Sequence, residues 1–297
     1  MTETLGGVPV ADESATGGSL VTEPGQLQYG RVLFGAGSKA GWRELVGWRD
    51  MPDAQVSDNQ RPQAHGTYAG DVFGDALTVT LTYLVTGTPE NKRLAIDALE
   101  AHTPMDGVER MLVVDDGTGP WFRMARVIGR QVPQGKHYNH APVECSVQFL
   151  CADPRRYALV QRSGTVTMPQ AVGGLDYPLT YPLSYGEPAT AALHAANDGG
   201  APTPLVVTFH GPLETPTLAT AGWRLGFDIT LVAGETLVVD TAEGTALLNG
   251  TADRLYTIQP AADPIEKCLL PPGGATLTLT AVDGTGTVSV AHRDARL

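Results

Sequence analysis

Apolar and polar residues alternate most regularly between positions 143 and 151. The odd-numbered positions are all apolar and polar side chains stand between them: Val143, Cys145, Val147, Phe149 and Cys151 against Glu144, Ser146 and Gln148. A repeat of two residues predicts a β-strand with one buried face. Pro154 follows closely; it cannot donate a ladder hydrogen bond and it disfavours helix at the residue before it. We interpret this stretch as the last strand of a first domain.

A second alternating stretch covers residues 77–85, where apolar residues alternate with threonines and predict another half-buried strand. Thr88 and Pro89 then have the character of an N-cap and a first helical residue. They predict a helix over residues 89–102, because an apolar stripe follows at helical spacing. The stripe consists of Leu94, Ala95, Ala98 and Leu99.

Shorter patterns predict five further strands: Arg31 to Phe34, Trp42 to Trp48, Met111 to Val114, Trp121 to Val132 and Thr165 to Met168. The glycine cluster at residues 35–41 lacks both phosphate-binding spacings and precedes a strand-like segment, so we interpret it as a hairpin turn. Residues 49–75 are rich in turn residues, and residues 1–26 are expected to form a partly ordered arm. Residues 27–152 are therefore predicted to form an open β-barrel or open sheet with one helix against it.

The sequence pattern of the chain changes after residue 152. Residues 153–204 repeat proline, glycine and tyrosine without a helix or strand period, which predicts an extended connector. Residues 205–297 contain only short β patterns separated by Gly, Pro and Asp turns, which predict an antiparallel β-sandwich or jelly roll. The predicted strands are 205–209, 223–231, 236–240, 246–248, 255–258, 275–282 and 286–292. The whole chain is therefore expected to be mainly β.

Composition narrows the possible functions. The 297 residues include 35 Gly and 22 Pro, and the net charge of −12 disfavours specific nucleic-acid binding, which needs a concentrated basic surface. The three cysteines, Cys145, Cys151 and Cys268, have no metal-binding spacing and no even disulfide framework, so they are expected to be core thiols in a reducing compartment. No signal peptide or membrane-spanning run is apparent, so synthesis in a cytoplasm and no membrane contact are expected.

Residues with catalytic or ligand-binding potential are few. His137 and His140 lie three residues apart without a third metal ligand, and Asp115–Asp116 is better explained as the turn of a hairpin. The nucleophile-elbow and zinc-protease motifs are missing from the sequence, so neither catalytic residues, a metal nor a cofactor is predicted. Trp223 and Tyr256 could stack on a sugar ring, although their strand-like surroundings favour core packing.

The order of these features resembles the distal tail proteins of long-tailed, non-contractile bacteriophages. The resemblance rests on the terminal strand followed by residues 152–157, the Gly/Tyr-Pro connector, and two segments of the β-only part, 234–241 and 269–274. The segment from Arg61 to Gly70 also fits the N-terminal domain of that family. Each motif is common by itself, and the specificity lies in their order and spacing over nearly the whole chain from about residue 27.

The resemblance implies a structural virion protein at the tail tip, made in the cytoplasm of the host bacterium. Such proteins form a ring of six copies through their N-terminal β domains, and a galectin-like second domain projects outwards. The implied partners are further copies of the chain, the tail tube protein, the hub proteins of the tip or baseplate, and the tape-measure protein. DNA only passes through the channel, and an acidic wall would let it slide.

Two other functions are weighed against this one. The second domain could be a carbohydrate-binding adhesin module that contacts the host cell wall through Trp223 and Tyr256. An enzyme would need a pair of carboxylates facing a cleft, and no pair has supporting spacing. Within the structural interpretation, Asp153, Arg155, Arg156 and Tyr157 are predicted to contact either the joint between the domains or a neighbouring subunit.

Overall fold

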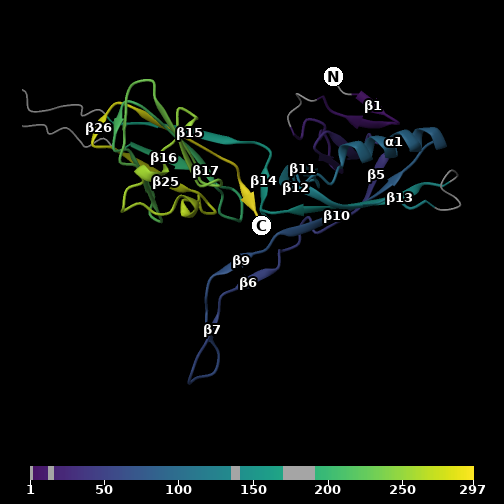
Figure 1. Cartoon of the computed structure of the whole chain (residues 1–297), viewed down its shortest axis with the longest axis horizontal. Coiled ribbons are helices and arrows are strands. Elements are labelled where there is room, and N and C mark those ends of the chain that lie inside the picture. Colours follow the sequence, from purple (N-terminus) through teal and green to yellow (C-terminus); the bar gives the residue numbers. More distant parts are fainter. Residues whose placement is uncertain (1–2, 13–16, 135–140, 170–190) are drawn as a thin grey trace, which may run out of the picture. The chain divides into compact units, whose positions relative to one another are not determined.

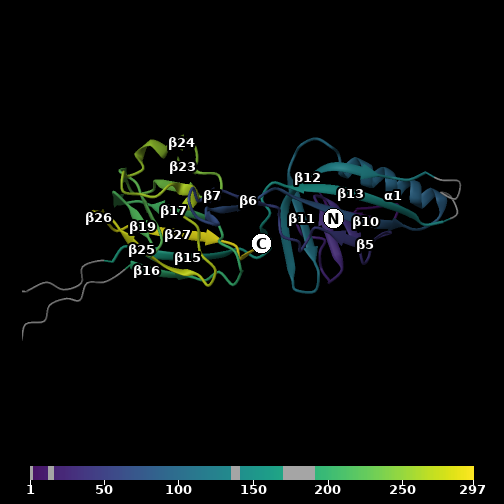
Figure 2. The same cartoon turned by 90° about the horizontal axis from the view of Figure 1, so that it is seen from below.

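A computed structural model describes residues 3–12, 17–134, 141–169 and 191–297. The chain forms two compact units, Met1–Leu159 together with Leu297 and Val160–Arg296, and each is described by itself below. The first unit contains β1 to β14 and the second contains β15 to β28, drawn from teal through green to yellow (Figures 1 and 2). Both units are built from antiparallel sheets, so the mainly β fold class is confirmed.

The first unit is built on one long antiparallel sheet in the order β1-β2-β4-β3-β11-β12-β13-β10-β5. Short β14, Arg156–Ala158, pairs with β12 at Trp121 and Phe122. The nine strands are β1 Glu3–Leu5, β2 Val8–Val10, β3 Gln26–Tyr29, β4 Val32–Gly35, β5 Ala40–Val46, β10 Leu77–Val85, β11 Arg110–Asp115, β12 Pro120–Gln131 and β13 Val143–Cys151. The two strands predicted from their alternation, β10 and β13, pair along their whole length from Leu77 opposite Cys151 to Val85 opposite Val143.

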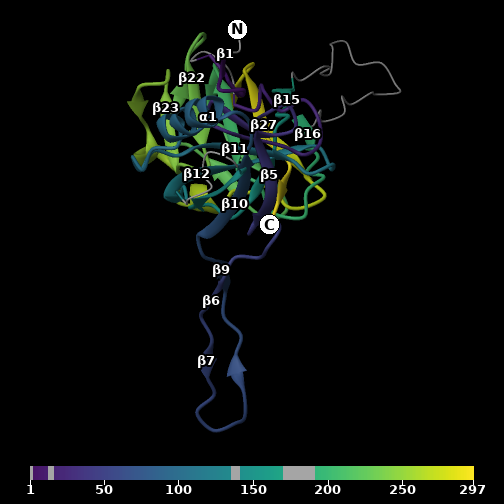
Figure 3. The ribbon, with the colours of Figure 1, turned by 90° about the vertical axis from the view of Figure 1, so that its right-hand side faces the viewer.

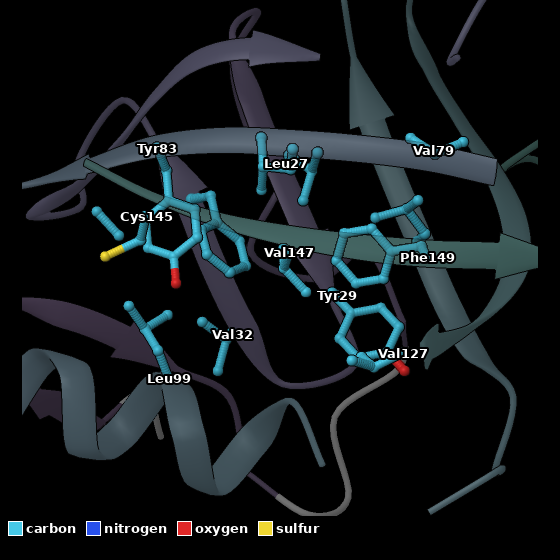
Figure 4. Close-up of a cluster of buried hydrophobic side chains, with 14 of the residues drawn as sticks. Leu27, Tyr29, Val32, Val79, Tyr83, Leu99, Val127, Cys145, Val147 and Phe149 are labelled. Carbon is cyan, nitrogen blue, oxygen red and sulfur yellow. The ribbon is translucent and has the colours of Figure 1, made fainter. Parts of the chain in front are cut away.

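The sheet curves so that its two halves enclose a core. Tyr29 of β3 lies with its ring centroid 4.7 Å from that of Phe149 of β13, although β11 and β12 separate these strands in the sheet. Phe34 of β4 makes an edge contact with Tyr83 of β10, with the ring centroids 5.1 Å apart. Leu99 of the helix points into the same cluster (Figure 4). The first unit is therefore an open, barrel-like sheet with a helix against it, as the sequence predicts.

Helix α1 runs from Pro89 to His102 and begins as predicted: the backbone N–H of Asn91 donates to the Thr88 hydroxyl, and Pro89 occupies the first turn. The predicted buried stripe is wrong at Leu94, which is 41% exposed. Lys92 and Ile96 are buried instead. Lys92 reaches the core edge because its long apolar stem packs inward while its ammonium donates to the carbonyl of Ala141 at 2.8 Å.

Two predictions about the N-terminal part are wrong. Residues 3–12 are not an arm outside the fold: β1 and β2 extend the sheet, and Val8 and Val10 are buried in the core. The glycine cluster at 35–41 is not a hairpin turn either, because β4 pairs with β2 and β3 whereas β5 pairs with β10. The segment instead carries the chain between two distant parts of the same curved sheet.

Residues 49–75, predicted to be turn-rich, form a two-stranded hairpin that extends beyond the sheet (Figure 3). Its inner half pairs β6, Ala54–Val56, with β9, Val72–Gly74, and its outer half pairs β7, Asn59–Gln60, with β8, Thr67–Tyr68. We call residues 53–74 the hairpin arm. It leaves the sheet between the ends of β5 and β10.

The second unit packs several antiparallel sheets around one core, which confirms the predicted sandwich. The six-stranded sheet runs β15-β27-β17-β22-β23-β24, the four-stranded sheet β16-β25-β19-β20, and the three-stranded sheet β21-β18-β26. The strands of these three sheets are β15 Arg162–Thr167, β16 Ala191–Ala195, β17 Leu205–His210, β18 Leu213–Glu214, β19 Thr217–Ala219, β20 Arg224–Gly226, β21 Thr230–Leu231, β22 Thr236–Asp240, β23 Thr245–Leu248, β24 Ala252–Asp253, β25 Ala275–Thr280, β26 Asp283–Gly284 and β27 Thr287–His292. A last short strand, β28 Ala295–Arg296, belongs to none of the three. Phe209 of β17 meets Phe227, just after β20, edge to face at 6.0 Å, so one aromatic pair links two of the sheets.

Two further predictions need correction here. Leu255–Thr257, predicted as part of a strand, is a short 3₁₀ helix, η1, because Thr257 and Ile258 donate back to the carbonyls of residues 254 and 255. A second 3₁₀ turn, η2, covers Ile265–Lys267. The predicted connector at 153–204 is wrong at its ends, where β14, β15 and β16 lie, and β15 pairs with β27 of the second unit instead of joining the first domain. Residues 170–190, the centre of that connector, lie outside the described residues.

Candidate interaction sites

The segment that follows β13 folds into a compact polar knot. The carboxylate of Asp153 accepts hydrogen bonds from three donor groups: the backbone N–H of Arg155 at 2.9 Å, the Arg155 Nε at 2.9 and 3.1 Å to the two oxygens, and the hydroxyl of Tyr157 at 2.6 Å. The Tyr157 ring lies 5.8 Å from that of Phe122 on β12. Three of the four predicted contact residues, Asp153, Arg155 and Tyr157, therefore bind one another.

Burial and hydrogen bonding shift the pKa of Asp153 in opposite directions. Burial by itself would raise the pKa of Asp153, but the hydrogen bonds from Arg155 and Tyr157 outweigh it and hold the pKa below its ordinary value. Burial, reinforced by the neighbouring Asp153 carboxylate, raises the pKa of Tyr157 well above its ordinary value. Asp153 is thus charged and Tyr157 is a neutral donor at neutral pH.

Replacing Asp153 by asparagine is expected to lower the free energy of unfolding of the first unit by about 1 kcal/mol at pH 7, since the ionised acceptor is lost but a third of its side chain is exposed to screening solvent. The folded pKa of Asp153 is depressed, so its stabilisation is complete above the unfolded value near ~4 and disappears as the pH falls through the folded value. Urea unfolding of both proteins at pH 7 and pH 3 measures this. A difference that does not shrink at pH 3 contradicts the assignment.

Behind the knot, Arg123 of β12 occupies a fully buried position. Its Nε donates to the carbonyl of Pro154 at 3.0 Å, and its Nη1 donates to the carbonyls of Gly47 and Trp48 at 3.3 and 2.9 Å. Its guanidinium also lies 5.0 Å from the centroid of the Trp48 ring. One side chain therefore ties the end of β5, where the hairpin arm begins, to the segment that leaves β13.

Further contacts join the same two places. The fourth predicted contact residue, Arg156, places its guanidinium 6.0 Å from the Trp48 ring. A Cβ at Gly74 would meet Pro52 at 2.7 Å and Pro154 at 3.5 Å, so the arm's base packs closely around these prolines. The residues predicted from sequence as contacts thus lie at the base of the hairpin arm. Arg123 and Trp48, which complete the cluster, were not predicted.

A groove of about 370 Å³ opens beside the arm's base, along β5. Its walls are mostly apolar and include two tryptophans: Trp42, Leu45, Val46, Gly47, Trp48, Arg49, Asp50 and Asp116. An ion pair between Arg49 and Asp116, 2.8 Å apart, stands at one side. Asp116 belongs to the predicted hairpin turn between β11 and β12, so the structure supports the turn and not a catalytic carboxylate pair.

The two predicted sugar-stacking aromatics of the second unit lie in different surroundings. Trp223 is 8% exposed and its indole N–H donates to the carbonyl of Leu269 at 2.8 Å. It lines a cavity of about 650 Å³ whose other walls are Leu269, Pro271 and alanine, glycine and threonine residues, and which Tyr256 does not line. Tyr256 on η1 is 79% exposed, and the Arg254 guanidinium lies 6.0 Å from its ring centroid.

Comparison with solved structures identifies the architecture. The chain superposes on the crystal structure of the Dit (gp 19.1) protein of phage SPP1, described as a paradigm of the hub adsorption apparatus in phages infecting Gram-positive bacteria, with a TM-score of 0.63. The match covers 92% of this chain and 99% of the SPP1 protein at 14% identity. This chain has the Dit fold. The predicted resemblance to distal tail proteins is confirmed at the level of the fold.

Two chains of the phage p2 baseplate in its activated conformation also match, with TM-scores of 0.49 and 0.48 at 9% and 8% identity. They cover 91% and 86% of this chain and 98% and 91% of their own lengths. No protein-family profile matches the chain. No curated protein sequence matches it either.

The remaining candidates add no chemistry to this Dit fold. His137 and His140 lie outside the described residues. Within the described ranges, no three His, Cys, Asp or Glu side chains are grouped so that they could hold a metal ion. Cys145, Cys151 and Cys268 are all buried free thiols, in agreement with the predicted core positions. Among the described helices, none is long and apolar enough to cross a bilayer.

Proposed function

We propose that this chain is a structural component of a phage tail tip, a distal tail protein whose first units assemble into a ring of about six copies. The observation that carries the proposal is the match to SPP1 Dit, which extends over 92% of this chain and 99% of that protein and so includes both units in the same order. A fold shared over two units in sequence is far more specific than either β architecture alone.

The ring joins the tail tube to the hub proteins of the tip and leaves a channel for the tape-measure protein and then for DNA. The net charge of −12 supports this use, because an acidic protein does not gain the counterion release that would hold DNA in place. The absence of sequence motifs for catalysis also fits a scaffold. In this proposal Asp153, Arg155, Arg156 and Tyr157 set the geometry of the subunit contact or of the joint between the units.

A sugar-binding role for the second unit ranks below the structural one. Stacking on a sugar needs an exposed aromatic face beside hydrogen-bonding groups. Trp223 is buried and its N–H is already bonded, while exposed Tyr256 does not line the Trp223 cavity.

Native mass spectrometry and negative-stain images of the purified chain test the ring. We expect a closed particle of about six copies whose mass does not change when sugars are added. A strict monomer at ~100 μM, even with the tail tube protein present, would count against the proposal, because ring contacts of standard size hold at that concentration. Charge reversal of both Arg155 and Arg156 should break the particle or alter its outline; an unchanged ring removes these two residues from the proposed contact.

A further inference from the structure

The three-stranded sheet of the second unit, β21-β18-β26, carries two exposed valines. Val232 comes directly after β21 and is 58% exposed, and Val282 comes directly before β26 and is 75% exposed. Backbone contacts hold both beside the middle strand. A Cβ at Gly211 would meet the carbonyl oxygen of Val232 at 2.1 Å, and the N–H of Val282 donates to the carbonyl of Glu214 at 2.9 Å. The two valines therefore flank β18 and are open to solvent.

The middle strand also carries an uncompensated charge. The register places Glu214 of β18 directly opposite Asp283 of β26, and both residues are exposed. No described basic side chain forms an ion pair with either carboxylate. Like charges directly opposite each other destabilise an antiparallel pair, so a cation placed between them would replace repulsion by attraction. We call Val232, Val282, Glu214 and Asp283 the β18 patch.

Backbone strain occurs at the residue that follows Glu214. Thr215 has a φ of 51°, a left-handed conformation that β-branched residues rarely adopt. Its N–H donates to the carbonyl of Ile229 at 2.9 Å, which holds the residue in place. Strained residues and local conflicts of charge or polarity persist in proteins mainly where they serve a function. Exposed valines, opposed carboxylates and a strained residue on one short strand therefore indicate a binding surface.

A second surface of the same unit combines a cation with apolar side chains. Arg254, Leu255 and Tyr256 form the exposed side of η1 and its N-cap, with Tyr256 the most exposed of the three. Arg254 forms no ion pair with a described carboxylate, and the neighbouring Asp253 carboxylate accepts from the N–H of Leu255 at 2.8 Å. Tyrosine and arginine are enriched at the energetic centres of protein interfaces. We call residues 254–256 the η1 knob.

Hydrogen bonds order the η1 knob before any contact forms. The N–H groups of Thr257 and Ile258 donate to the carbonyls of Arg254 and Leu255 at 2.9 and 3.2 Å. The Arg254 N–H donates to the carbonyl of Ala246 on β23 at 2.8 Å, and the Thr257 hydroxyl donates to the Arg254 carbonyl at 2.8 Å. Because the turn is already ordered, binding through it loses little conformational entropy.

Only two different copies of the chain can bring these surfaces together. The η1 knob and the β18 patch belong to the same compact unit, and Tyr256 and Val282 both remain exposed in it. A cation beside an aromatic ring complements two carboxylates beside two valines, and such charge complementarity selects and orients a partner. Each copy has one knob and one patch, so the contact can repeat around a rotation axis.

We propose that the η1 knob of one copy docks on the β18 patch of a second copy. In this contact the Arg254 guanidinium lies between the carboxylates of Glu214 and Asp283, while Leu255 and Tyr256 cover the two exposed valines. The docking joins second units and is separate from the proposed ring of first units, so either contact can form without the other. Salt weakens the docking, because it screens the ion pairs at the edge of the contact.

A disulfide test addresses the docking directly. Leu255→Cys combined with Val282→Cys should give covalently linked chains after mild oxidation, with peptides that join positions 255 and 282. Mixing ¹⁴N- and ¹⁵N-labelled protein shows that the link joins different copies. The native cysteines are buried and do not compete. Leu255→Cys combined with Val160→Cys is the matched control, since Val160 of the same unit is 73% exposed but lies outside the patch, and it should give no link.

Charge reversal in the chain with cysteines at 255 and 282 tests the ion pairs. Arg254→Glu should lower the yield of the link at least ~10-fold, because it places a third negative charge against the patch. Adding Glu214→Arg and Asp283→Arg to that same chain should restore the yield, which a misfolded protein would not do. Lys267→Glu reverses another exposed cation of the second unit and should leave the yield unchanged.

The outcomes separate this docking from the proposed function. If negative-stain images show rings but no 255–282 link forms between copies, or if Arg254→Glu leaves its yield unchanged, the docking proposal fails and the ring stands. If the link forms between copies and responds to charge reversal, but the unmodified chain forms no ring even with the tail tube protein, the docking stands and the proposed function fails.

Discussion

Replacing Arg123 by alanine is expected to lower the free energy of unfolding of the first unit by about 3–5 kcal/mol. The side chain is fully buried and donates to three carbonyl groups, those of Pro154, Gly47 and Trp48. Burial lowers the pKa of Arg123 to about 10, so it remains charged at neutral pH. In the alanine variant no charge is buried, which offsets part of the loss. However, the three carbonyl groups lose their donor and a large void is left beside Trp48.

Two variants separate these contributions. Arg123→Met restores most of the volume without restoring the donors, so it should lose about half as much stability as alanine, because well-packed apolar substitutes tolerate the loss of a buried charge. Arg126→Ala, three residues further along β12 and partly exposed, is the matched control and should change stability by less than ~1 kcal/mol. A loss at Arg123 no greater than that at Arg126 would show that the buried cluster does not stabilise the unit.

Native thiols provide the measurement. Burial raises the pKa of Cys145 to about 11 and that of Cys268 to about 12, so both thiols are unreactive in the folded protein near pH 8. Cys145 belongs to the first unit and Cys268 to the second. Thiol labelling across a urea series, read by peptide mass spectrometry, therefore gives one unfolding curve for each unit. Arg123→Ala should move the Cys145 curve to lower urea.

The elements that the sequence predicted well are those whose signal is local. β10 and β13 alternate over nine residues each, because one face of each strand packs on the core, and this pattern needs no knowledge of the neighbouring strands. The start of α1 was predicted for the same reason: Thr88 and Pro89 act on the first turn only. Binary patterning and capping chemistry are properties of single segments.

Elements that depend on distant pairing were missed. β1 and β2 are three residues each and owe their place to β4, so no alternation of useful length exists. Segment 35–41 looked like a hairpin turn because the sequence does not reveal that β5 pairs with β10. Lys92 was not predicted on the buried face of α1, since the pattern of apolar and polar residues counts lysine as polar by its ammonium group and ignores its long apolar stem.

The sequence singled out part of the polar knot, and the role of these residues in a contact stays a prediction. Asp153, Arg155 and Tyr157 stood out because they follow an abrupt strand end, and the structure shows that they bind one another. The sequence also contains a signal for Arg123. In the alternation of β12 it lies on the same face as Ala125 and Val127, which are both buried, and so occupies a core-facing position. An arginine on the apolar face of a strand needs carbonyl or carboxylate partners nearby.

Asn197 plays a corresponding part in the second unit. It is fully buried, and its amide group donates to the carbonyls of Ala201, Leu270 and Pro271 at 2.9, 3.4 and 3.3 Å. Its side-chain oxygen accepts from the backbone N–H groups of Gly199 and Ala295 at 3.0 and 3.3 Å. One amide thus ties three segments of the unit together. Only a side chain with both donors and an acceptor satisfies all of these groups.

Asn197→Asp is expected to lower the free energy of unfolding of the second unit by about 3–4 kcal/mol at pH 8. The new carboxylate has nearly the same shape, but it points an acceptor at three carbonyl oxygens. Burial and these oxygens raise the folded pKa of the new group above its unfolded value near ~4, so the penalty grows as the pH rises from there toward the folded pKa. The loss should therefore be smaller at pH 5, where the protonated acid can donate one hydrogen bond.

The Cys268 labelling curve reports this loss, and Asn249→Asp provides the control. Asn249 lies in an exposed turn, where its side-chain oxygen accepts from the backbone N–H of Thr236 at 2.9 Å, and a carboxylate can accept in the same way. That variant should change stability by less than ~1 kcal/mol, with little dependence on pH. Equal losses at positions 197 and 249, or a loss at 197 that is the same at pH 5 and pH 8, would mean that the backbone N–H groups of Thr203 and Gly274, which donate to the carbonyl groups of Leu270 and Pro271 at 3.0 Å, satisfy these groups without the amide. In that case the buried amide group of Asn197 would not be the group that holds the loop closed.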